Sequence, residues 1–159
     1  MNKQKLHTAL FLAYGALMIW LLFDRPGYDP AVPYWDQVTA QLNLIPFRTL
    51  RLFAGLLDSG VRSHITMAVI NLGGNIIMFI PLGFLLPKVF PKLSSLPRVL
   101  LTTAIIITIV EIIQLFTLVG SCDIDDLILN SLGFLMGYGI YLLVNKLKSV
   151  KLIFVSLAL

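Results

Sequence analysis

Acidic side chains are concentrated at one point of this sequence. Asp123, Asp125 and Asp126 lie within four positions, contribute three of the eight acids, and directly precede an almost wholly apolar stretch. Carboxylates can transfer protons as general acids or bases, or hold a divalent cation through their oxygens. They can also cap the start of a helix, where unpaired N–H groups and the helix dipole favour an anion. Both kinds of role remain open for all three residues.

A further carboxylate lies inside an apolar segment. Glu111 and Gln114 are three residues apart in IVEIIQLF, so they share one face of a helix. Glu111 precedes the outer end of that segment, at Val119, by eight residues, which places it ~12 Å below that end. We expect Glu111 to be protonated, paired or beside a wet cavity, because an unpaired ionised glutamate at this depth is costly. It is a candidate acid or base, and a structural hydrogen bond between helices is the alternative.

Amide side chains occupy the apolar segment before it. Asn71 and Asn75 are four residues apart and share a helical face, at a depth similar to that of Glu111. Buried amides need hydrogen-bond partners, so these two either bind a ligand or tie helices together. Pro81 lies further along the same segment, where its missing backbone donor predicts a kink or a break in the helix.

The segment that follows the acids has one distinctive face. Asp126, Asn130, Gly133 and Gly137 are spaced by four, three and four residues, so all four lie on the same side of a helix. That side carries polar side chains at its outer end and only glycines further in. The Gly-x-x-x-Gly spacing allows a neighbouring helix to pack closely. We therefore expect Asp126 and Asn130 to point into a helix bundle.

These residues must be positioned by membrane helices. The 159 residues are 58% hydrophobic and 13% charged, with a mean hydropathy of +0.90, whereas a soluble domain is ~25% charged. Four apolar segments are each near the ~20 residues needed to cross a bilayer. The sequence predicts an all-α integral membrane protein of one domain, 1–159, with four transmembrane helices, the second kinked or broken, and an amphipathic outer loop segment. The predicted transmembrane segments are about 6–23, 65–90, 96–119 and 124–144.

The distribution of charge predicts the orientation. Basic residues without any acid among them flank the N-terminus, the link between the second and third segments, and the C-terminus. The positive-inside rule then places both termini in the cytoplasm, and residues 24–63 and 120–126 outside. The net charge of +4 therefore reports topology, and no nucleic-acid partner is expected. The single cysteine, Cys122, excludes an intramolecular disulfide and a Cys-based zinc site.

The outer loop carries cations that can serve a polar site. NLIP, from Asn43 to Pro46, predicts a turn, and an amphipathic stretch with Arg48 and Arg51 follows. Arginine binds carboxylates and phosphates with two parallel hydrogen bonds. Alternatively, the two arginines extend toward lipid phosphates.

Together, these residues predict a wet pocket near the outer surface, roofed by the arginine-bearing loop and with the acids at its rim. Asp123 and Asp126 are also candidate Mg²⁺ ligands, although D-x-D-D is a short pattern that acidic turns produce by chance. The candidate catalytic residues are Glu111, Asp126 and Asp123, and the candidate ligand-binding residues are Arg48, Arg51, Asn43, Asn75, Gln114 and Asn130.

Four blocks of the sequence stand out together: NLIPF (Asn43–Phe47), NIIMFIPLGFLLP (Asn75–Pro87), EIIQLF (Glu111–Phe116) and DIDDLILNSLGFLMG (Asp123–Gly137). In content, order and spacing they resemble the VanZ-like membrane proteins, over a core of about 43–143. The resemblance implies a small multi-pass protein of the bacterial cytoplasmic (inner) membrane. It also implies a link to resistance against the glycopeptide teicoplanin, which is a phenotype and not a reaction. The family often has a basic residue before the acidic turn, where this chain has Ser121 and Cys122.

Three functions stay open at this point. The pocket can bind an envelope lipid or a lipid-linked cell-wall precursor, which would reduce access of an antibiotic. It can instead belong to an enzyme that modifies a lipid headgroup or wall intermediate, with Glu111 as acid or base and Mg²⁺ at Asp123 and Asp126. Transport is the third, since Glu111 lies beside a disrupted helix, but four helices would need a homodimer to form a path.

Overall fold

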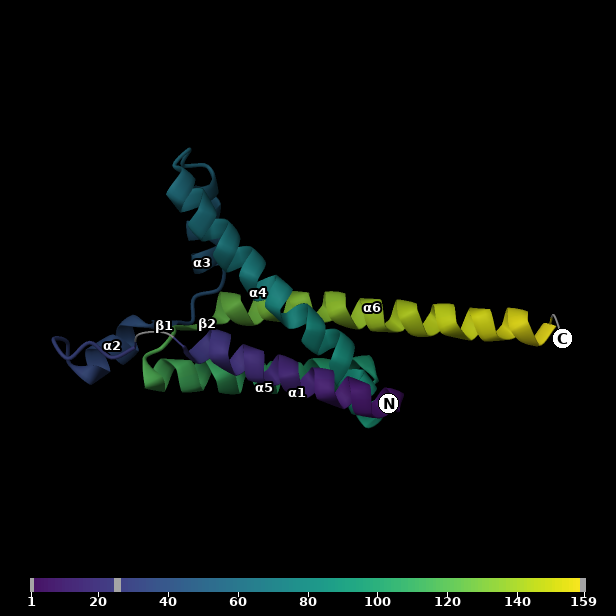
Figure 1. Ribbon diagram of the computed structural model, residues 1–159. Coiled ribbons are helices and arrows are strands. Elements are labelled where there is room, and N and C mark those ends of the chain that lie inside the picture. The colour runs from purple at the N-terminus through teal and green to yellow at the C-terminus, as the bar shows by residue number, and fades with distance from the viewer. Residues whose placement is uncertain (1, 25–26, 158–159) are drawn as a thin grey trace.

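The computed structural model describes residues 2–24 and 27–157, with side chains as far as residue 149. Within these ranges four helices are long and apolar enough to cross a membrane: α1 (Lys3–Phe23), α4 (Arg62–Val89), α5 (Leu96–Thr117) and α6 (Ile124–Leu157) (Figure 1). Their ends fall within three residues of the predicted ones, except that α6 continues past residue 144. The predicted all-α fold with four transmembrane helices is therefore confirmed.

The remaining elements are short and lie at the ends of these helices. Between α1 and α4 come α2 (Tyr34–Ala40), β1 (Leu42–Asn43) and α3 (Arg48–Leu57). A 3-10 turn, η1 (Pro91–Leu93), joins α4 to α5, and β2 (Cys122–Asp123) joins α5 to α6. The sequence predicts a turn from Asn43 to Pro46, and the structure has it slightly later, at residues 45–47, because Asn43 belongs to β1. The helix α3 that follows is amphipathic, as predicted.

The helix α4 is continuous through Pro81 and Pro87. The sequence predicts that this helix is kinked or broken, and the structure shows that it is not broken. Unwinding a helix within hydrocarbon exposes backbone groups that have no water to bond with. One missing donor at Pro81 costs less than opening a whole turn.

Close packing of α4 on α6 forms the centre of the bundle. A Cβ atom placed on Gly133 would overlap the Ile76 carbonyl oxygen, and one on Gly137 would overlap that of Ile80. From the α4 side, Gly83 is equally close to the Phe134 backbone. The predicted close approach at the Gly-x-x-x-Gly motif is therefore confirmed. Beside it lies the main hydrophobic core: Met18, Phe79, Leu82, Leu86, Val99, Ile107, Phe134 and Tyr138.

The other long helices pack around this pair. The Tyr14 hydroxyl of α1 donates to the Met78 carbonyl of α4 over 2.8 Å. Figure 1 shows α3 and the first half of α4 diverging from the bundle as a separate arm. No residue of α3 is buried.

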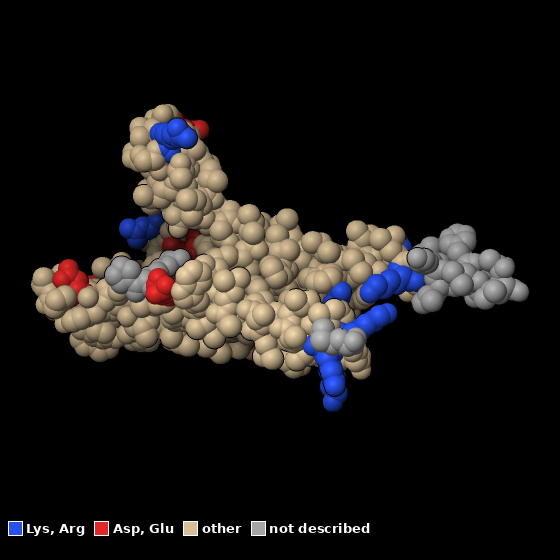
Figure 2. Space-filling model, in the orientation of Figure 1, with Lys and Arg blue, Asp and Glu red and all other residues tan. Residues whose placement is uncertain are grey.

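Charged side chains separate along the bundle. Figure 2 shows Lys and Arg gathered near the start of α1 and the far part of α6, while Asp and Glu lie at the opposite end, together with a few cations on the α3–α4 arm. This is the separation that the sequence indicates. The assignment of the basic end to the cytoplasm remains a prediction.

Two extended segments fold back into the bundle at its acidic end. Strands β1 and β2 pair in parallel, with Leu42 opposite Cys122 and Asn43 opposite Asp123. The Cys122 N–H also donates to the Gln41 carbonyl over 3.0 Å. The predicted rim position of the acids is wrong for Asp123 and Asp125, which are 6% and 0% exposed. Helix periodicity gave no sign that the connecting turn descends into the protein.

Candidate functional site

A polar cavity lies where the arm meets the bundle. Its volume is about 220 Å³, and its walls come from the last turn of α1, the middle of α4, the second half of α5, the turn before β2, and the start of α6. Seven of the lining side chains are polar, in an otherwise apolar group of helices. They are Asn71, Asn75, Glu111, Gln114, Ser121, Asp126 and Asn130.

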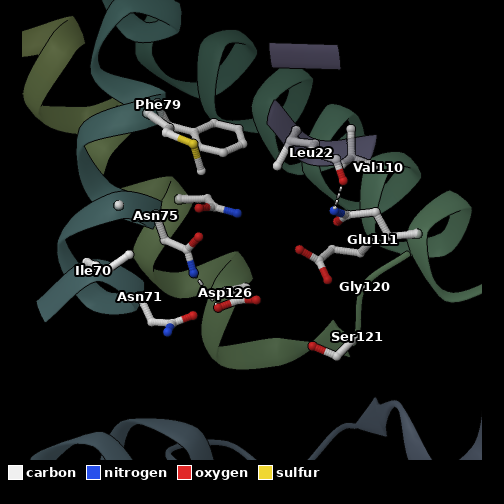
Figure 3. A pocket seen from close by; sticks show the side chains of 14 residues that line it. Leu22, Ile70, Asn71, Asn75, Phe79, Val110, Glu111, Gly120, Ser121 and Asp126 are labelled. Atoms are coloured by element: carbon white, nitrogen blue, oxygen red, sulfur yellow. Dashed lines mark hydrogen bonds between the residues drawn. The ribbon is translucent and has the colours of Figure 1, made fainter. Parts of the chain in front are cut away.

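Two carboxylates form opposite walls of this cavity. Figure 3 shows the side chains of Glu111 and Asp126 pointing toward one another from α5 and α6. Glu111 is 6% exposed, and its Oε2 accepts a hydrogen bond from the Asp123 backbone N–H over 3.2 Å. The sequence leaves three states open for Glu111: protonated, paired or beside a cavity. In the structure Glu111 has a hydrogen-bond partner and also lies beside a cavity.

Amides from three helices complete the polar walls. Asn75 of α4 donates to Oδ1 of Asp126, as Figure 3 shows. Gln114 of α5 donates to the Leu22 carbonyl at the end of α1 over 3.0 Å. The amide of Asn130 lies on the same face of α6 as Asp126, as predicted, and is 5% exposed. Its Oδ1 is buried and accepts no hydrogen bond within the described structure.

The carboxylate of Asp123 joins the two re-entrant strands. Its Oδ1 accepts from the Asp125 N–H over 2.8 Å, which makes Asp123 the N-cap of α6, one of the two roles that the sequence leaves open. Its Oδ2 accepts from the Asn43 amide over 3.0 Å and from the Thr49 hydroxyl. Neither Asp123 nor Asn43 lines the cavity. Both therefore hold β1 and α3 against the start of α6.

The carboxylate of Asp125 caps a different helix. Its two oxygens accept from the backbone N–H groups of Phe47, over 2.6 Å, and Leu50, over 3.1 Å, at the start of α3. Phe47 has a φ of 64°, in the left-handed region that is costly for a side chain with a Cβ. The fully buried Asp125 carboxylate compensates for this cost and satisfies two amides that the helix leaves unpaired.

The two arginines of α3 lie outside the cavity. Arg48 and Arg51 are exposed on α3, and neither contributes to the cavity wall. Among the described residues no Lys or Arg lines it. Contact of these arginines with a ligand therefore requires a ligand that extends beyond the cavity mouth.

The described residues contain no group of three or more His, Cys, Asp or Glu side chains arranged to hold a metal ion. Asp126 lines the cavity and Asp123 does not, and both Asp123 oxygens already accept hydrogen bonds. The two aspartates thus do not face a common point, and Mg²⁺ binding by this pair remains a prediction.

Comparisons with known proteins show the family of this chain. The family described as VanZ/LLP1 matches residues 11–145. This chain belongs to the VanZ family. Protein VanZ of Enterococcus faecium is 30% identical to it over 141 residues, which are 89% of this chain and 76% of that protein. No solved structure matches this chain.

The four sequence blocks that resemble VanZ-like proteins each contribute residues at the acidic end of the bundle. The first supplies Asn43 of β1 and Phe47 before α3, and the second supplies Asn75 of α4. The third supplies Glu111 and Gln114 of α5, and the last supplies Asp123 of β2 and the first half of α6. Sequence reasoning missed Ser121 and Leu22 as wall residues and Thr49 as a partner of Asp123. A lone serine in a turn, a leucine in an apolar run and a threonine in a loop carry no signal of their own.

Proposed function

We propose that this VanZ-family protein binds the headgroup of an envelope lipid, or of a lipid-linked cell-wall precursor, in the cavity between α4, α5 and α6. The observation that supports the proposal is a hollow of about 220 Å³ with seven polar side chains, among helices otherwise suited to hydrocarbon. Polar groups at such positions are costly and usually functional. A binding site typically combines apolar walls with a few convergent polar groups.

In this proposal the headgroup occupies the cavity where the arm meets the bundle. Asn75, Gln114 and Asn130 would contact the headgroup, and Arg48 and Arg51, exposed on α3, would contact a phosphate that stays outside. Sequestration of a precursor or a change in envelope lipids would then explain a link to teicoplanin resistance. The basic end of the bundle would face the cytoplasm of a bacterial inner membrane, which puts the cavity on the outer side.

Native mass spectrometry of the detergent-purified protein with bacterial lipid extract tests this proposal. A retained species of defined mass is the expected result, and its loss in Arg48→Gln/Arg51→Gln would implicate the arginines. Arg62→Gln is the matched control, because Arg62 is also exposed on the arm, at the start of α4. Absence of any retained lipid in the wild-type protein would refute lipid binding.

A second candidate function is favoured by one observation, the facing pair of Glu111 and Asp126 carboxylates (Figure 3). Such a pair can serve as acid and base in an enzyme that modifies a headgroup or a wall intermediate. An enzyme should leave altered lipids or precursors in cells that express it, detectable by mass spectrometry. It should also lose this effect in Glu111→Gln while the protein remains in the membrane.

A further inference from the structure

An apolar groove lies beside the polar cavity, between α1, α4 and α5. Its volume is about 220 Å³, the same as that of the cavity. Among the described residues that line it, the Tyr14 hydroxyl is the one side-chain oxygen or nitrogen, and it already donates to the Met78 carbonyl over 2.8 Å. The groove therefore offers a ligand no free hydrogen-bond donor.

The groove and the cavity meet at three side chains. Leu22, Phe79 and Val110 line both hollows. Figure 3 shows all three in the upper part of the view, away from Asn71 and Ser121. The apolar groove thus begins where the polar walls of the cavity end.

The groove follows one face of α1. Phe11, Tyr14, Met18 and Leu22 line it and are spaced by three, four and four residues, which places them on the same side of the helix. From Phe11 to Leu22 the helix rises ~16 Å, about half of the ~30 Å hydrocarbon core of a bilayer. The groove therefore has the length of a chain from one leaflet. It runs from the cavity toward the basic end of the bundle, near which α1 begins (Figure 2).

The walls of the groove favour hydrocarbon over water. A water molecule inside a protein needs about two to four polar partners, and these walls do not supply them. If the groove were empty, its side chains would lose dispersion contacts. Gly15 adds room, since a Cβ atom placed there would meet no atom within 4 Å. Ile19 lines the groove and is 65% exposed, so a chain can enter from the side.

We propose that this groove holds an acyl chain of the lipid whose headgroup occupies the polar cavity. The inference rests on the proposed function and specifies where the chain of that lipid lies. A headgroup in the cavity stays attached to chains that need apolar surroundings, and the groove is an apolar hollow that shares three wall residues with the cavity. A smaller hollow of about 140 Å³ also adjoins the cavity, at Glu111, but Asp123 and Thr108 line it, and these polar groups suit hydrocarbon less well.

The cavity and the groove are also linked by a hydrogen bond. Gln114, which lines the cavity, donates to the carbonyl of Leu22, which lines both hollows. This bond holds the end of α1 against α5 above the groove. A headgroup that contacts Gln114 would therefore lie next to the start of its own chain.

The test uses the full-length protein in detergent with bacterial lipid extract. Gly15→Leu places a branched side chain in the groove without a close contact at its Cβ atom. Native mass spectrometry should then show at least about tenfold weaker retention of the lipid that the wild-type protein keeps, because the added side chain overpacks the filled groove. Gly139→Leu is the matched control and should retain this lipid as the wild type does. A Cβ atom at Gly139 also meets no atom within 4 Å, and this residue lines neither hollow. Both variants should keep the wild-type melting temperature.

A cross-linking experiment examines the groove without filling it. The photoreactive residue p-benzoylphenylalanine replaces Phe11, which lines the groove on the far side of Tyr14 from Leu22. After irradiation of intact cells, mass spectrometry should find an adduct with the acyl chain of the same species that native mass spectrometry detects. The same replacement of Phe116, exposed on α5 outside the groove, should instead capture membrane lipids in proportion to their abundance.

The outcomes separate the inference from the proposed function. Equal lipid retention by the wild type and Gly15→Leu would overturn the groove assignment and leave headgroup binding intact. Absence of any retained lipid in the wild type would refute the proposed function itself. A cross-link from position 11 to a second copy of the protein, or to the same lipid mixture as position 116, would also overturn the inference. If Gly15→Leu does not fold, the cross-link at position 11 decides.

Discussion

The backbone N–H of Asp123 donates to the carboxylate of Glu111, twelve residues earlier in the chain, over 3.2 Å. A helix that simply ended at the surface would have left these residues far apart. The contact exists because the chain turns after α5 and descends again as β2, beside β1. Buried backbone outside a helix persists only where the protein satisfies its N–H and C=O groups. Glu111 therefore has a structural partner and a position on the cavity wall at the same time.

Substitutions of Glu111 should separate these two roles. In Glu111→Gln the amide oxygen can still accept from the Asp123 N–H, so the protein should keep its melting temperature. In Glu111→Leu that N–H loses its acceptor, at a cost of about 1–3 kcal/mol. Thermal unfolding in detergent measures the difference. Both variants remove the carboxylate from the cavity wall, so a change in lipid retention that both share would come from this loss and not from stability. Equal stability of the two would contradict the structural role.

Asp125→Asn should loosen the arm. The carboxylate caps α3 through two backbone amides and is fully buried, and a hydrogen bond to a charged group contributes about 1.5–3 kcal/mol. We expect faster hydrogen exchange at residues 47–50, measured by mass spectrometry, together with a lower melting temperature. Asp58→Asn, at the exposed end of α3, is the control and should change neither quantity. Unchanged exchange in Asp125→Asn would show that the cap is dispensable.

Glycines on α6 should differ sharply in their tolerance of alanine. Gly133→Ala places a methyl group against the Ile76 carbonyl and must push α4 from α6, which we expect to cost about 1–3 kcal/mol. Gly139 lies on the same helix, and a methyl group added there would meet no atom within 4 Å, so Gly139→Ala should be neutral or stabilising by up to ~1 kcal/mol. Melting temperatures in one detergent provide the comparison, and a similar loss in both variants would exclude packing as the cause.

Cys122 should react slowly with maleimides at neutral pH. Burial, and then the nearby carboxylates of Glu111 and Asp123, raise the pKa of its thiol. Because the thiolate is the reactive form, a raised pKa means less thiolate at pH 7 and a labelling rate that increases with pH. Ser59→Cys in a Cys122→Ser background provides an exposed reference thiol and should react faster at pH 7. Equal rates would contradict the shift.

Labelling of introduced thiols also tests the orientation in the membrane. In intact cells a membrane-impermeant maleimide should reach the Ser59→Cys thiol at the acidic end of the bundle. A thiol introduced by Ser149→Cys, near the basic end, should stay unlabelled until the membrane is opened. The reverse pattern would show that both termini lie outside.

Membrane insertion dictates what the sequence could predict. A run of ~20 apolar residues has few alternatives to a membrane-spanning helix. The four helices can therefore be predicted from composition. The helical faces of Glu111 with Gln114, and of Asp126 with Asn130, follow from the 3.6-residue period. The cavity thus contains Asn75, Glu111, Gln114, Asp126 and Asn130, all five of which are candidates on sequence grounds.

The roles of the other acids depend on tertiary contacts that no period encodes. Asp125 caps α3, which lies 75 residues or more away in the sequence, and Asp123 contacts Asn43 and Thr49 across a similar separation. A two-residue parallel strand pair has no periodicity to detect. For the same reason the exposure of Arg48 and Arg51 outside the cavity could not be read from their spacing.

The pairing of β1 with β2 also sets an order for biogenesis. The segment that contains β1 and the start of α3 leaves the ribosome long before Asp123 and Asp125, which supply its partners. Until α6 inserts, those amides must stay hydrated at the membrane surface. The segment between α1 and α4 therefore docks last, and a nascent chain arrested after α5 would already have three of the four long helices but an incomplete cavity.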